Sequence, residues 1–186
     1  MKKSLVVCLC LLVFACQKED AIVKLDWRQK IDKGISKYNL SLEVESTKLY
    51  EEEGKKGKIT YFKENSEGYY KITNEITDKN EYPYFQAIYF LNKRIIKTEL
   101  ETLRPFIIKN KQTSDPCCVL SRKDVYFRTD NSAFKKSKEL SIVDFNQYII
   151  KRKEFSSTVD SKEEWIPNAN EEYNKILKLV ESFKDK

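Results

Sequence analysis

A long succession of short alternating segments most constrains the fold of this chain. Between Leu40 and about Phe134, the periodicity of apolar residues is strand-like, and polar turns interrupt it. Leu40, Leu42 and Val44 show the alternation of a half-buried strand. Sequential strands with short polar turns favour an antiparallel meander, because a parallel sheet would need crossover helices between its strands.

Several turns in this stretch predict where the strands reverse. The charged, glycine-broken residues 51–57 predict a turn, and residues 64–68 predict the turn of a hairpin. Asn92-Lys93 predicts a compact reversal after an almost wholly apolar central strand. Arg122-Lys123-Asp124 predicts the turn of a last hairpin. The strands expected between these turns are residues 58–63, 69–76, 84–91, 94–100, 117–120 and 125–128.

Both ends of the chain beyond residue 20 predict helices. Residues 21–38 place one apolar stripe at helical spacing, formed by Val23, Trp27, Ile31, Ile35 and Tyr38. Residues 142–153 predict a second helix, with a strand through Ile149-Ile150 as the alternative. Asn168 predicts the cap of a last helix, whose apolar stripe comprises Tyr173, Ile176, Leu177, Val180 and Phe183. We therefore expect one α+β domain over residues 21–186: a curved antiparallel meander with the N-terminal and C-terminal helices packed on one face.

The first residues look like a targeting segment. Lys2 and Lys3 precede an apolar run over residues 5–15, which is too short to span a membrane. The residues before Cys16 are Val13-Phe14-Ala15, and this pattern resembles the lipobox of bacterial lipoproteins. The resemblance implies that residues 1–15 are a signal peptide and that acyl chains anchor Cys16 to a membrane. A plain secretory signal with an incidental cysteine is the alternative.

The four residues after Cys16 predict the membrane to which the protein is sent. Gln17, Lys18, Glu19 and Asp20 resemble the lipoprotein export signal of the Bacteroidota. This resemblance implies an outer-membrane lipoprotein that faces the cell exterior; the periplasmic face is the alternative. Residues 16–20 make only a short tether, so we expect the domain to lie close to its membrane.

Charge and composition exclude some function classes. The chain carries 35 Lys and Arg against 29 Asp and Glu, a net charge of +6. These charges are interspersed rather than clustered in a basic stripe, so we expect no nucleic-acid partner. The chain contains no histidine, which removes serine-histidine and cysteine-histidine nucleophile pairs and imidazole metal sites. We expect no enzyme activity, no cofactor and no metal site.

The exported domain retains one adjacent pair of cysteines, Cys117 and Cys118. Neighbouring cysteines can close a strained vicinal disulfide, and strained disulfides are easily reduced. Two half-buried thiols in a strand are one alternative, and intermolecular or metal chemistry is another.

Aromatic residues crowd into the region between residues 61 and 90, interleaved with lysines. Either both faces of these strands are core, or one face binds a partner, because tyrosine combines a rigid apolar body with a polar tip. The residues of this candidate binding face are Tyr61, Lys63, Tyr69, Tyr70, Lys71, Tyr84, Tyr89 and Lys93.

Two functional classes follow from this sequence. The first is a non-enzymatic binding lipoprotein for a protein or glycan, with an inhibitor or immunity role among the options. The second is an outer-membrane carrier or accessory protein that holds an apolar ligand between sheet and helices. An uncharacterised enzyme is a third, weaker alternative. The sequence does not indicate the oligomeric state.

Overall fold

The computed structural model describes residues 27–76, 82–105 and 117–185. The chain divides into two units, Met1–Leu40 and Ser41–Lys186, and each is described by itself. In the first unit, residues 27–39 form a helix. The predicted N-terminal helix is therefore confirmed over this range, whereas its predicted start at residue 21 lies outside the described residues. Within the described residues, no helix is long and apolar enough to cross a membrane.

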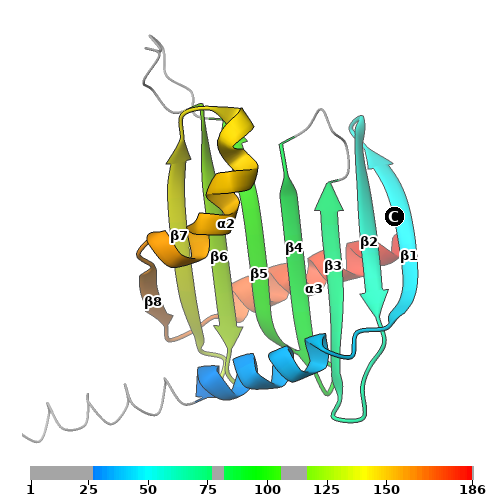
Figure 1. Cartoon of the computed structure of the whole chain (residues 1–186). Helices are drawn as coiled ribbons and strands as arrows, with labels where there is room; N and C mark the ends of the chain where they lie inside the picture. The colour runs from blue at the N-terminus through cyan, green and yellow to red at the C-terminus, as the bar shows by residue number, and fades with distance from the viewer. Residues whose placement is uncertain (1–26, 77–81, 106–116, 186) are drawn as a thin grey trace, which may run out of the picture. The chain divides into compact units, whose positions relative to one another are not determined.

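The described part of the second unit contains an eight-stranded antiparallel sheet in which the strands are neighbours in chain order (Figure 1). This arrangement confirms the predicted α+β meander. The strands are β1 (Val44–Glu52), β2 (Lys55–Phe62), β3 (Tyr69–Ile76), β4 (Tyr84–Leu91), β5 (Arg94–Pro105), β6 (Cys118–Phe127), β7 (Ala133–Ile142) and β8 (Lys162–Ile166).

Two of the predicted turns are tight two-residue reversals. Glu53 and Gly54 join β1 to β2, with φ angles of 53° and 78°. Asn92 and Lys93 join β4 to β5, with φ angles of 49° and 65°. Positive φ at both central residues is the geometry that matches the twist of a hairpin. The predicted turn over residues 51–57 is thus shorter than expected, because most of its charged residues belong to the two flanking strands.

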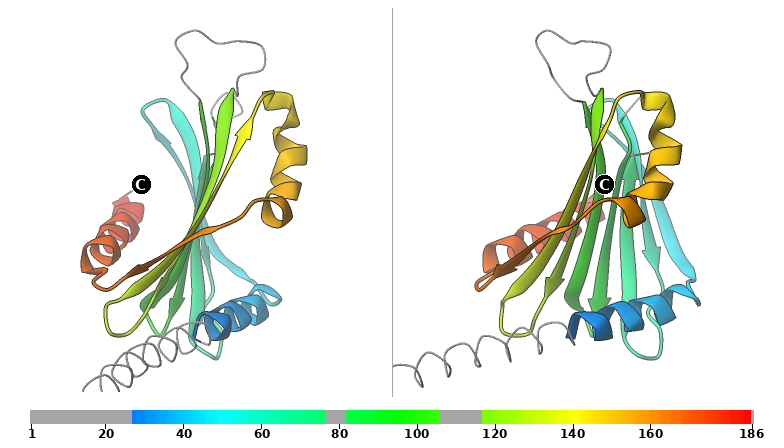
Figure 2. Two further views of the ribbon diagram at one scale, coloured as in Figure 1. Left: turned by 90° about the vertical axis from the view of Figure 1, so that its left-hand side faces the viewer. Right: turned by 60° about the vertical axis from the view of Figure 1, so that its left-hand side comes forward.

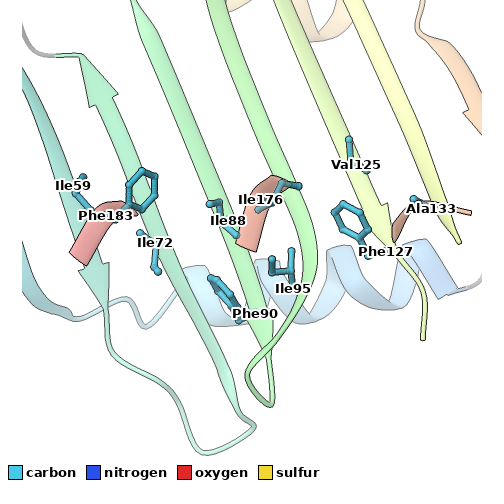
Figure 3. Packing of buried hydrophobic residues seen from close by; sticks show 11 residues of the cluster. Ile59, Ile72, Ile88, Phe90, Ile95, Val125, Phe127, Ala133, Ile176 and Phe183 are labelled. Carbon is cyan, nitrogen blue, oxygen red and sulfur yellow. The ribbon is translucent and has the colours of Figure 1, made fainter. Parts of the chain in front are cut away.

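One face of the sheet packs against α3 (Asn170–Asp185). Ile176 and Phe183 of α3 point toward the strands, where they join a cluster of buried apolar residues (Figure 3). The strands contribute Ile59, Ile72, Ile88, Phe90, Ile95, Val125, Phe127 and Ala133. Asn168 accepts a hydrogen bond from the Asn170 amide at 3.2 Å, which confirms its predicted role at the start of this helix.

The opposite face of the sheet packs against α2 (Tyr148–Thr158), which follows the short 3₁₀ helix η1 (Phe145–Gln147). The left view in Figure 2 shows α2 and α3 on opposite sides of the twisted sheet. Phe155 of α2 completes a second core cluster with Leu103, Cys118, Leu120 and Ile142. The alternative of a strand through Ile149-Ile150 is wrong, because both residues lie in the first turn of α2.

The predicted hairpin around Arg122-Lys123-Asp124 is also wrong, because these residues lie in the middle of the continuous strand β6. Each charge finds a partner there. The Arg122 guanidinium lies 3.2 Å from Asp124, and the Lys123 ammonium lies 2.6 Å from Glu172 of α3. The ion pairs on the two faces of the sheet thus stabilise three consecutive charged residues within β6. From their composition alone, these residues would be expected in a turn. Strands β7 and β8 carry too weak an alternation to be predicted from the sequence.

Candidate functional site

Ends of the first five strands and α3 together form an open groove of about 490 Å³, which we call the tyrosine groove. It is lined by Tyr50, Glu52, Lys55, Asn74, Ile76, Tyr82, Pro83, Tyr84, Thr102, Leu103, Arg104, Pro105 and Leu179. Three tyrosine rings, a carboxamide and charged side chains at the rim offer stacking surfaces and hydrogen bonds to a ligand. The groove joins residues that are as much as 129 positions apart in the chain, since Leu179 belongs to α3.

Tyr50 is held in the groove by two neighbours. Its hydroxyl donates a hydrogen bond to Asn74 Oδ1 at 2.8 Å. Its ring lies over Gly57, the residue directly opposite it on β2. A Cβ atom at position 57 would come within 2.2 Å of Tyr50 Cζ, so this glycine makes the room that the ring occupies. The contact between Tyr50 on β1 and Gly57 on β2 therefore holds this wall of the groove in place before any ligand binds.

Tyr84 supplies a stable hydrogen-bonding group. Its hydroxyl donates to Gln86 Oε1 at 2.9 Å. Burial, with a smaller contribution from Tyr50, raises the pKa of Tyr84 to about 12. The hydroxyl therefore stays protonated at physiological pH.

Tyr82 and Arg104 are exposed members of the groove, as are Glu52, Lys55 and Pro105. Tyr82 is 42% exposed, and its ring meets Phe145 edge to face with 6.2 Å between the ring centres. The Arg104 guanidinium lies 2.9 Å from Glu139 on the surface. An exposed ion pair of this kind contributes little to stability, so its arginine remains available to a partner.

The candidate binding face predicted from the sequence is not one surface. Successive residues of a strand point to opposite faces. Tyr61, Tyr70 and Tyr84 therefore share the α3 face, whereas Tyr69, Lys71 and Tyr89 share the α2 face. The prediction of a single binding face is therefore wrong, because the two-residue period of a strand divides these residues between both faces of the sheet. Of this set, only Tyr84 lines the tyrosine groove.

Most of these residues instead make contacts that stabilise the fold. Tyr70 stacks on Phe90 with 4.3 Å between ring centres, and the Tyr61 hydroxyl donates to the Phe183 carbonyl at 3.2 Å. Lys71 is buried, and its ammonium lies 4.6 Å from the centre of the Phe62 ring. Desolvation lowers the pKa of Lys71, while Glu99 opposes that shift.

Lys63, Tyr70 and Lys93 do meet in one open hollow of about 560 Å³ at the other end of the strands. Its remaining lining residues are Glu45, Phe62 and Glu64. The Lys63 ammonium lies 2.8 Å from Glu43 and is exposed. We call this the lysine hollow; its lining carries two lysines and two glutamates, so it has no net charge to attract a charged ligand.

A cluster of charges lies on the α2 face. Lys97 lies 2.9 Å from Glu99, which is directly opposite Asp124 across the strand pair, and Arg122 lies 3.2 Å from Asp124. Burial raises the pKa of Asp124, while the cationic neighbours Arg122 and Lys97 oppose that shift. Two cations thus balance two carboxylates. We interpret this cluster as a structural ion network rather than a binding site, since its charges already satisfy one another.

A smaller hollow of about 180 Å³ lies beside this network. It is lined by Arg122, Asp124, Lys136, Lys138 and Phe155. Arg122 lies directly opposite Lys138 and Asp124 directly opposite Lys136, so the lining carries three cations and one carboxylate.

Cys117 and Cys118 are thiols in the structure, with their sulfur atoms 2.9 Å apart. Cys118 is buried in the core cluster beneath α2, and Cys117 is half-buried. A vicinal disulfide therefore stays a prediction. Cys16 and the export residues Gln17 to Asp20 lie outside the described residues.

Four residues of the groove were not predicted from the sequence: Tyr50, Asn74, Tyr82 and Arg104. A tyrosine followed by a glycine seven residues later, across a glycine-containing turn, is the signal that could have indicated the Tyr50 contact. No protein-family model, curated protein or solved structure matches this chain.

Proposed function

We propose that this protein is a lipid-anchored, non-enzymatic binding module of the outer membrane that faces the cell exterior and recognises a partner protein through the tyrosine groove. The lipobox-like residues before Cys16 support the proposed lipid anchor, and the export-like residues Gln17 to Asp20 support the proposed location on the cell exterior. The arrangement of Tyr50, Tyr82 and Tyr84 beside Arg104 supports the binding role, and it is the observation that carries the proposal.

Tyrosine and arginine favour a protein partner. Both residue types are enriched at protein interfaces, and with tryptophan they supply most of the strongly contributing contacts. Tyr50 and Tyr84 are already fixed by hydrogen bonds to Asn74 and Gln86, so binding costs little side-chain entropy there. Tyr82 and Arg104 then provide exposed contacts for the partner.

A glycan is the second candidate ligand. The faces of tyrosine rings pack against the apolar faces of sugars, and Asn74, Glu52 and Lys55 line the same groove with hydrogen-bonding groups. Binding of a glycan would not need the rim cation Arg104. The response to Arg104→Ala therefore separates the two candidates.

The experiment uses intact cells that display a tagged form of the protein. Cross-linking and capture are carried out with the wild type, Tyr82→Ala, Arg104→Ala and the control Lys63→Ala, which alters the exposed lysine hollow. We expect one captured protein that is lost from both groove variants and kept by the control. Capture that is equal in all four proteins contradicts a role for the groove, and loss from Tyr82→Ala alone favours the glycan.

Protease shaving of the same cells tests whether the protein is exposed on the cell surface. Cleavage of the protein in intact cells agrees with display on the exterior. Resistance in intact cells combined with cleavage in lysed cells contradicts surface display and favours the periplasmic face. Mass spectrometry of the purified protein tests the acylation of Cys16 separately.

A further inference from the structure

Four large apolar side chains stand exposed on the segment that contains η1 and the first turn of α2. Val143 is 49% exposed, Phe145 48%, Ile149 67% and Ile150 59%. We call these four residues the α2 patch. Single exposed apolar residues are ordinary, but four of them within eight positions mark an interaction surface.

The helix geometry explains why the patch faces outward. Tyr148 and Phe155 are seven residues apart, two helical turns, and both pack toward the core cluster beneath α2. Ile149 and Ile150 therefore lie on the other side of the helix. Lys153 follows them by four and three residues, so it lies beside both on that outward side. The inner side of the helix thus carries Tyr148 and Phe155, and the outer side carries two isoleucines and a cation.

The charges around the patch decide which occupant it fits. Three consecutive bases, Lys151, Arg152 and Lys153, follow the two isoleucines. Lys151 pairs with Glu154 at 3.3 Å, and Arg152 pairs with Glu101 at 2.5 Å on the sheet. Lys153 is the exposed cation on the outward side. Apolar side chains next to a cation match the boundary between acyl chains and lipid phosphates.

We propose that the α2 patch docks on the headgroup region of the lipid bilayer that carries the chain. Phe145, Ile149 and Ile150 enter the boundary between headgroups and acyl chains, and Lys153 meets lipid phosphate. The proximity of this bilayer rests on the proposed lipid anchor at Cys16, because a tethered weak binder experiences a high effective concentration of its surface.

Docking at the α2 patch also restricts the partner of the tyrosine groove. Tyr82 lines that groove and contacts Phe145 of the patch, so the rim of the groove lies next to the docking surface. A partner that enters the groove then approaches along the membrane. We therefore expect the partner to be bound to the same membrane.

Tryptophan fluorescence in vesicles tests the docking. The full chain, as isolated from cells, is added to vesicles of phosphatidylethanolamine and phosphatidylglycerol that contain brominated acyl chains, which quench nearby tryptophans. The variants are Phe145→Trp and Ile149→Trp, with the control Lys178→Trp at an exposed position of α3 on the opposite side of the sheet. Wild-type emission from Trp27 and Trp165 is subtracted. We expect loss of most of the added emission at positions 145 and 149 and none at position 178.

A second measurement uses Ile149→Gln combined with Ile150→Gln, which leaves the buried side of α2 intact. Without the anchor, in a Cys16→Ala background, we expect vesicle binding to fall about tenfold or more when both isoleucines are replaced. Circular dichroism checks that the variant is folded. Unchanged vesicle binding overturns the proposal.

The outcomes separate the patch from the anchor. An acylated chain that stays on vesicles without quenching at positions 145 and 149 overturns the patch and retains the anchor. A chain without acylation whose vesicle binding depends on Ile149 and Ile150 retains the patch and overturns the anchor. Cross-linking between two copies through position 149, without quenching, shows that a second copy is the occupant and overturns the membrane proposal.

Discussion

Replacing Phe183 by alanine removes the most deeply buried contact between α3 and the sheet. The side chain is 0% exposed, and its ring lies among residues of the apolar cluster that include Ile59 and Ile72 (Figure 3). Loss of a buried phenyl ring costs about 3–5 kcal/mol, because the transfer free energy of the ring is lost and a cavity remains. For a domain whose total stability is on the order of 5–15 kcal/mol, this is a large fraction.

The contacts around Phe183 show why the site should not collapse around the cavity. The backbone at this end of α3 is tied to the sheet, since Tyr61 donates to the Phe183 carbonyl at 3.2 Å and Lys48 donates to the Lys184 carbonyl at 3.0 Å. These bonds hold the helix end at its distance from the strands. We therefore expect a cost at the upper part of the range.

Urea unfolding followed by circular dichroism measures this cost. With about 4 kcal/mol lost and a denaturant slope of roughly 2 kcal/mol/M, the midpoint should fall by about 2 M. Lys178→Ala is the matched control on the exposed side of α3 and should change stability by less than about 0.5 kcal/mol. A cost of Phe183→Ala below about 1 kcal/mol would refute the inference that α3 is held on the sheet by this ring.

Three further predictions concern the groove and the ion network. First, the pKa of Tyr84 is raised to about 12, so between pH 10 and 12 the unfolded chain loses this proton while the folded chain keeps it. Stability should fall by about 2–3 kcal/mol over that range, and Tyr84→Phe should lack this loss in unfolding experiments; parallel pH profiles of the two proteins would contradict it. Second, Gly57→Ala should displace the Tyr50 ring, cost about 1–3 kcal/mol and weaken partner capture, whereas in a Tyr50→Ala background most of that cost should disappear. Third, Lys97→Met should cost about 3–5 kcal/mol because it leaves Glu99 facing Asp124, while Lys58→Met at a partly exposed pair should cost less than about 1 kcal/mol. Because burial already raises the pKa of Asp124 and Lys97 opposes that shift, the Lys97→Met variant should recover stability relative to the wild type as the pH is lowered, and a flat difference profile would argue against the buried carboxylate pair.

Strands and turns with a clear local signal were predicted correctly. Residues 69–76 and 84–91 alternate or are apolar throughout, and the structure places strands β3 and β4 over these ranges. The Asn92-Lys93 reversal needs positive φ angles at both positions, a local requirement that asparagine meets more easily than most residues. The last helix was found from its cap and its apolar stripe.

Charged segments were the ones that the sequence analysis placed wrongly. Arg122-Lys123-Asp124 looked like a turn because three successive charges rarely fit a strand, yet Glu172 of α3 and Asp124 itself provide the partners. Strand β7 carries lysines at positions 135, 136 and 138, which obscure its alternation. Lys135 and Lys136 pair with Glu164 and Glu163 on β8. The charges of each strand are therefore balanced by those of the other strand, which the sequence of either strand alone does not indicate.

The sequence by itself determined the local pattern of this protein: the meander, the terminal helices, and the lipoprotein-like first residues on which the proposed address rests. These features depend on residues that are close together in the chain. Only the tertiary structure decided that α2 and α3 cover opposite faces and that Tyr50, Tyr84 and Leu179 line one groove. The physical reason is that side chains alternate between the two faces of a strand, so a shift of one residue in register changes which tyrosines meet.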